Sequence, residues 1–252
     1  IELDLPAPLG KSAQERSPIA VTFKRSATVA SSVDWPGRLQ ADYRATPEDD
    51  WRLWVELSDS VQAQGPDFSS LSSGETILVS GGYQGVDVQP WLSFFGNQLS
   101  NSTNKADVSF RVADLKLENA SLGVRSLGDV KLDAEIDGSD FTLEVESDWL
   151  QGTAKRSDGL EALQVAVSEI NLDFLLAENN PDQTSKGPEL EALRQLPNTQ
   201  LTIDNIRWRE NNIGGVSLSA GWEQSDLYLS SITGLLAGFN LNDETALRWS
   251  LG

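Results

Sequence analysis

The sequence lacks three chemically important residue types, since its 252 residues include no histidine, no cysteine and no methionine. Without histidine, Ser-His-Asp and Cys-His catalysis, histidine general bases and most zinc sites are excluded. Without cysteine, disulfides give no sign of the cellular compartment. Because the chain begins at Ile1 and contains no methionine, we expect it to be a piece of a longer protein.

Long apolar runs and basic residues are also scarce. No run reaches the length of a membrane-spanning helix, about 20 residues, and no segment has the pattern of a signal peptide. Lys and Arg number 19 against 38 Asp and Glu, which gives a formal net charge of −19. A surface of this sign repels phosphate groups and anionic membrane faces, so we expect no nucleic-acid partner.

The abundant feature is an alternation of apolar and polar residues with a period of two. It covers residues 108–117, 130–136, 141–145 and 163–172, with one phase slip near Glu169. Alternation of this kind is typical of antiparallel strands with one buried face, whereas helical patterns are rare in this chain. The sequence therefore predicts an all-β fold with one or two short helices.

An internal repeat organises these strands. Residues 127–134 match residues 213–220, and residues 139–143 match residues 225–229, both at an offset of 86 residues. A strand unit that recurs along one chain predicts an elongated, stacked architecture. The expected segments are 1–106 with a short helix near 88–98, 107–177 as the first repeat unit, 178–198 as a mobile loop and short helix, and 199–252 as the second repeat unit.

Acidic and glycine-rich segments suggest other chemistry that we weigh against a structural role. The acidic residues are Glu48, Asp49 and Asp50, and the cluster Asp133, Glu135, Asp137 and Asp140. Residues 133, 135 and 137 alternate with apolar positions, and neither EF-hand spacing nor an aromatic cleft accompanies them, so we expect a solvated strand face and no metal. The glycines at 81, 82, 85, 214 and 215 precede no phosphate-loop helix and are interpreted as strand bulges or bends. We therefore expect no cofactor and no enzymatic activity.

Several segments, in this order along the chain, resemble the YhdP family of AsmA-like bacterial envelope proteins. They are Leu5-Pro6-Ala7-Pro8-Leu9-Gly10-Lys11 with Ser17-Pro18-Ile19, then Ser80-Gly81-Gly82-Tyr83-Gln84-Gly85-Val86-Asp87-Val88-Gln89-Pro90-Trp91-Leu92, then Leu196-Pro197, Ile203 to Trp208, and Ile213-Gly214. The likeness covers nearly the whole chain.

The resemblance implies a strongly curved antiparallel sheet, a taco-like groove with an apolar interior. It also implies a parent protein that is anchored in the inner membrane of a Gram-negative bacterium, crosses the periplasm and helps to move phospholipids to the outer membrane. The expected partners are phospholipid acyl chains, with both membranes contacted through other parts of the parent, and this piece is expected to be a monomer. Alternation alone favours a β-sandwich that serves as a scaffold or adhesin-like module for a protein partner, and the resemblance reverses that preference.

The residues expected to line the groove are the apolar members of the alternating runs. They are Val108, Phe110, Val130, Leu132, Phe141, Leu143, Val165, Val167, Leu201, Ile203, Val216, Leu218, Leu227 and Leu229. A helix over 88–98, capped by Asp87, carries Trp91, Leu92, Phe94 and Phe95. These four side chains predict either a plug at the end or edge of the sheet or a lid at the mouth of the groove.

Overall fold

The structure is a computed structural model that divides into two units. It describes residues 7, 18–25, 29–45, 50–58, 76–90, 109–123, 125–138, 140–157, 162–176, 198–223 and 226–250. Unit 1 spans Ile1–Gly138 and unit 2 spans Ser139–Gly252. The expected helix near 88–98 and the expected mobile loop and short helix at 178–198 fall largely outside the described residues.

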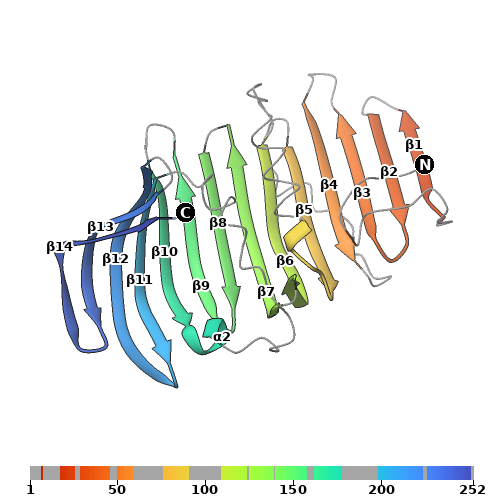
Figure 1. Ribbon diagram of the computed structural model, residues 1–252. Coiled ribbons are helices and arrows are strands. Elements are labelled where there is room, and N and C mark those ends of the chain that lie inside the picture. Colours follow the sequence, from red (N-terminus) through yellow and green to blue (C-terminus); the bar gives the residue numbers. More distant parts are fainter. Residues whose placement is uncertain are drawn as a thin grey trace. The chain divides into compact units, whose positions relative to one another are not determined.

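Unit 1 is a single sheet in which the strands follow chain order (Figure 1). Its strands are β1 (Ala20–Arg25), β2 (Val29–Trp35), β3 (Leu39–Ala45), β4 (Trp51–Ser58), β5 (Thr76–Gln84), β6 (Ser109–Leu122) and β7 (Arg125–Asp137). The side chain of Tyr83 ties β5 to the β2–β3 turn, since its hydroxyl donates a hydrogen bond to the Arg38 carbonyl.

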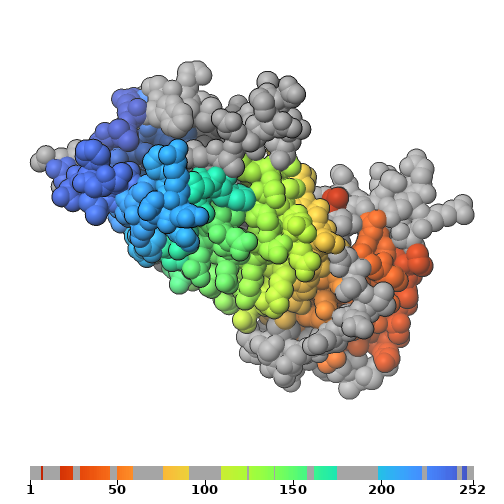
Figure 2. Space-filling model, turned by 90° about the horizontal axis from the view of Figure 1, so that it is seen from below, coloured from red at the N-terminus to blue at the C-terminus, as the bar shows by residue number. Residues whose placement is uncertain are grey.

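Unit 2 is built in the same way and adds a short helix. Its elements are β8 (Asp140–Ser147), β9 (Leu150–Arg156), β10 (Leu163–Asn171), α2 (Leu172–Leu176), β11 (Thr199–Trp208), β12 (Asn211–Glu223), β13 (Asp226–Leu236) and β14 (Phe239–Ser250). The Asn171 side chain caps α2 by accepting a hydrogen bond from the Asp173 N–H at 3.0 Å, and Phe174 stacks on Trp149 at 4.8 Å between ring centroids. The strands of this unit lie side by side in chain order (Figure 1, Figure 2). The ribbons of β11 to β14 bend along their length (Figure 1).

The expected all-β class, with a curved open sheet and little helix, is confirmed. The sheet is mixed, however, because β5 runs parallel to both β4 and β6, and β11 runs parallel to β10. Parallel neighbours need a crossover connection of about a dozen residues or more. Long connections precede each of them, between Ser58 and Thr76, Gln84 and Ser109, and Asn171 and Thr199. A period of two does not distinguish parallel from antiparallel pairing.

Both repeat copies share specific irregularities of the backbone. The β6–β7 register shifts between Leu117 and Ala120, and the β11–β12 register shifts between Ile203 and Ile206, which lie 86 residues further along the chain. Gly128 and Gly214, which the repeat aligns, both have positive φ (69° and 122°). The expected phase slip near Glu169 is a register shift between Val167 and Glu169 in the β9–β10 pair. Such bulges increase the twist and bend of a strand.

We expect Gly81→Ala to destabilise unit 1 strongly. Gly81 has φ of 105°, and a Cβ atom there would overlap the Leu57 carbonyl oxygen of β4. The strained backbone alone costs roughly 1–3 kcal/mol of unfolding free energy, and the clash adds to it. Gly128→Ala is the matched control, because Gly128 has φ of 69° but no atom within 4 Å of a built Cβ. Urea unfolding of both variants measures the difference, and equal losses would contradict the assigned clash.

Candidate functional site

Cross-strand register places the predicted groove residues of unit 2 on one face of its sheet. Residues opposite each other on neighbouring strands share a face, and the face alternates along each strand. Leu201 lies opposite Leu218 of β12 and beside Val165 of β10. On the other side of β10, Val165 lies opposite Ala154, which lies opposite Leu143 of β8.

The same reasoning extends this face to β13. Ala220, two positions from Leu218, lies opposite Leu229, and Trp222 lies opposite Leu227. We call the shared surface the apolar face of unit 2. The predicted residues that lie on it are Phe141, Leu143, Val165, Val167, Leu201, Ile203, Val216, Leu218, Leu227 and Leu229.

Unit 1 has an apolar face of its own, defined in the same way. Phe110 lies opposite Ile136 and beside Ile77, and after the bulge Leu115 lies opposite Leu132. Val130 follows two positions from Leu132, so Phe110, Val130 and Leu132 share one face. The pairs Leu53–Ile77 and Tyr43–Leu53 continue this face to β4 and β3. The prediction that the two repeat copies form one continuous surface concerns both units and stays a prediction.

Five of the predicted site residues fall on parts of the chain without a description. Val108, Trp91, Leu92, Phe94 and Phe95 lie outside the described residues. The segment just before Trp91 is described. The Asp87 carboxylate accepts hydrogen bonds from the N–H groups of Gln89, at 3.0 Å, and Gly123, at 2.9 Å. Asp87 therefore occupies a capping position, as its place in the sequence predicts.

The apolar faces are only partly covered by the described residues. Apart from α2 against β11, the elements that pack together appreciably within each unit are neighbours in its sheet, so no second sheet lies on either face in the described part of the chain. Leu218 and Leu201 are half-buried, Phe23 on β1 is 79% exposed and Leu247 on β14 is 58% exposed. A sandwich would bring strands that are distant in sheet order into face-to-face contact, and the described residues show no such packing.

A smaller cluster on the opposite face of unit 1 is not predicted by the sequence reasoning. Trp54 lies opposite Asp42 and beside Leu78, and the two apolar side chains are 5% and 8% exposed. Ala113, at the β6 bulge, packs against them. The only sign of this cluster in the sequence is Trp54, an apolar residue between Leu53 and Val55 that must point to the opposite side of the strand. A single residue of this kind is too little to predict a second buried surface.

The acidic side chains of β7 brace the bulges in β6. Asp114 and Asn119 both have φ of 51°. The N–H of Asp114 donates to Asp133 Oδ1 and the N–H of Asn119 donates to Asp129 Oδ1, each at 2.9 Å. These hydrogen bonds satisfy backbone groups that a bulge removes from the strand ladder. Among the described residues, no three acidic side chains gather closely enough to hold a metal ion.

Two lysines lower the pKa of the Asp114 carboxyl below its ordinary value of 3.8, through a side-chain hydrogen bond from Lys116 first and then one from Lys131. Both ammonium groups lie 3.2 Å from the carboxylate. A lowered pKa in the folded state means that the stabilisation is present above the unfolded pKa and is lost as pH falls through the folded pKa. Because the pair is exposed to solvent, the effect on unfolding is small.

We expect a carboxyl-carbon NMR titration to give a midpoint for Asp114 below that of an unpaired aspartate. In the Lys116→Met variant the midpoint moves upward, because the first of the two hydrogen bonds is lost. An unchanged midpoint in this variant would contradict the assigned pairing.

Comparison with known proteins identifies the family. A family model described as YhdP protein matches residues 1–250. No curated protein and no solved structure matches the chain. Within the described residues, no helix has the length and apolar character needed to cross a membrane. Since the match covers nearly the whole sequence and agrees with the curved, repeated sheet, the chain belongs to the YhdP family of bacterial envelope proteins.

Proposed function

We propose that this chain is a segment of a periplasmic groove that carries phospholipids between the inner and outer membranes and so supports outer-membrane lipid homeostasis and barrier function. The observation that supports it best is the apolar face that crosses all strands from β8 to β13 without a second sheet over it in the described residues. Family membership supports the envelope setting. In this proposal the chain acts by binding and has no enzymatic activity.

Acyl chains fit this face energetically. Each methylene removed from water contributes about 0.8 kcal/mol, so a chain of about sixteen carbons gains on the order of 10 kcal/mol before ordering costs. Transport needs a path without a deep energy minimum. Neighbouring strands that repeat Leu, Val and Ile at equivalent positions offer similar contacts at each step, for example Val165, Leu201 and Leu218.

Native mass spectrometry of protein purified from bacteria tests the proposal. The expected spectrum contains the chain mass and additional peaks displaced by the mass of a phospholipid. A fluorescent phospholipid is also expected to bind and to be displaced by unlabelled lipid. A spectrum of the lipid-free chain alone, together with no uptake of the fluorescent lipid, would overturn the proposal.

A further inference from the structure

A hollow of unit 2 is lined chiefly by residues of the face opposite the proposed lipid path, and Ala220 and Trp222 of the apolar face also contribute to it. It has a volume of about 530 Å³ and is lined by residues of β10, β11, β12 and β13 and by the segments just before β10 and β11. Gln164 lies beside Gln200, Gln200 lies opposite Ser219, and Ser219 lies opposite Ser230. These four side chains therefore form a row across the sheet, on the face opposite Val165, Leu201, Leu218 and Leu229.

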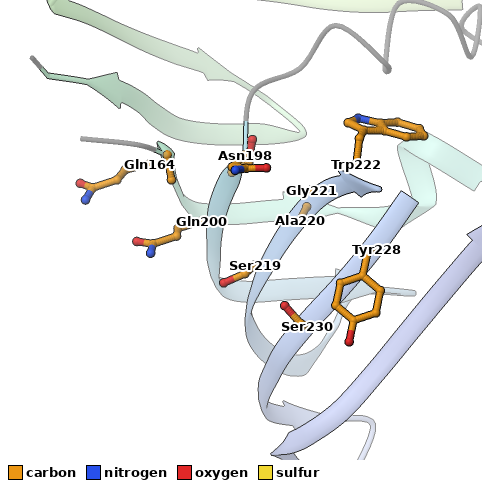
Figure 3. Close-up of a pocket in the computed structure, with 11 residues that line it drawn as sticks. Gln164, Asn198, Gln200, Ser219, Ala220, Gly221, Trp222, Tyr228 and Ser230 are labelled. Atoms are coloured by element: carbon orange, nitrogen blue, oxygen red, sulfur yellow. The ribbon is translucent and has the colours of Figure 1, made fainter. Parts of the chain in front are cut away.

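An aromatic ring closes one side of this row. In Figure 3, Ser219 and Ser230 lie between the two glutamines and Tyr228. Tyr228 lies opposite Gly221 of β12, a position with no side chain to occupy the hollow. A Cβ atom at Gly221 would lie 2.8 Å from Asn198 Oδ1, so glycine at this position leaves room for the Asn198 side chain, which also lines the hollow.

The lining is neutral although the chain has a net charge of −19. None of the residues that line the hollow is Asp, Glu, Lys or Arg. Two charged residues border the lining by register: Lys155 lies opposite Gln164, and Arg248 lies opposite Tyr228, with its guanidinium Nε held 2.6 Å from Asp226 Oδ2. A neutral lining does not match a metal ion, which needs carboxylates, or a phosphate group, which needs cationic partners.

The polar groups present match a different ligand chemistry. Glutamine amides and serine hydroxyls both donate and accept hydrogen bonds, as the hydroxyl groups of a sugar do. Among the described residues, no hydrogen bond engages the side chains of Gln164, Gln200 or Ser230. The face of an aromatic ring is electron-rich and attracts the C–H groups on the apolar side of a sugar ring. We propose that this hollow is a binding site for a neutral oligosaccharide.

The test measures sugar binding to the full chain by isothermal titration and by saturation-transfer NMR. The probes are tri-N-acetylchitotriose and maltotriose, two neutral trisaccharides. We expect at least one of them to bind with a Kd on the order of 1 mM, which is typical of a shallow site with few hydrogen bonds. Tyr228→Ala is expected to weaken binding at least tenfold. Gln200→Ala is expected to weaken it at least fivefold.

Matched controls make the result specific to the hollow. Thr202→Ala alters the same face of β11 two positions from Gln200, outside the lining, and is expected to leave the Kd unchanged. Leu218→Asp, on the apolar face, is also expected to leave it unchanged. The proposal is overturned by the absence of binding of both sugars at about 10 mM, by equal weakening in Thr202→Ala, or by full affinity in folded Tyr228→Ala and Gln200→Ala. None of these results bears on lipid binding, which the native mass spectra report separately.

Discussion

Leu218→Asp is expected to abolish lipid capture by unit 2 while the unit remains folded. Leu218 lies in the centre of β12, with Leu201 opposite on β11, and its side chain is half-buried. On an open face the new carboxylate still reaches water, so folding does not bury an unpaired charge. An acyl chain that passes over the same position must remove that water. Lipid capture is therefore expected to fall by at least tenfold, which corresponds to about 1.4 kcal/mol.

Ser217→Asp is the matched control for this prediction. Ser217 is the preceding residue of the same strand, faces the opposite side, and has its hydroxyl 3.2 Å from that of Thr202. The same charge at this position is expected to leave lipid capture unchanged. Circular dichroism melts and a fluorescent-lipid assay on both variants give the answer. Unfolding of Leu218→Asp alone would indicate a closed core, and equal lipid capture by both variants would place the lipid path elsewhere.

The side of the sheet on which a residue lies was largely predictable from the sequence. A period of two forces Val216, Leu218 and Ala220 to one side, and the expected register of the repeat agrees with the shared bulges at residues 117–120 and 203–206. The phase slip near Glu169 was visible because the apolar positions change parity there. These features follow from the sequence of each strand by itself, because they depend only on the alternation of its side chains.

Features that depend on distant segments were not predictable in this way. The parallel pairs are β4–β5, β5–β6 and β10–β11. They cannot be recognised from the alternation, because successive side chains point to opposite sides of the sheet in parallel and antiparallel strands alike. The bracing of Asp114 by Asp133 requires the register of β6 against β7. The polar hollow was missed because glutamine and serine on an outward face have the pattern of an ordinary solvated surface.

Trp54→Ala is expected to give the opposite outcome, a loss of stability without a loss of lipid affinity. The indole is 5% exposed and packs on the polar side of unit 1 with Leu78 and Ala113. Its removal leaves a cavity and lowers the free energy of unfolding by about 3–5 kcal/mol. The folded fraction keeps its apolar face, because Leu53 and Val55 point to the other side of β4.

Leu53→Asp completes this comparison within one strand. Leu53 is half-buried on the apolar face, opposite Tyr43 and beside Ile77, so its replacement is expected to lower lipid capture and to change the urea midpoint little. Urea unfolding by circular dichroism gives stability, and the lipid assay is run where each variant is folded. If Trp54→Ala lost lipid with unchanged stability, or if Leu53→Asp unfolded the chain, the assignment of the two faces would be reversed. The two neighbouring residues thus separate the surface that stabilises unit 1 from the surface that is proposed to contact lipid.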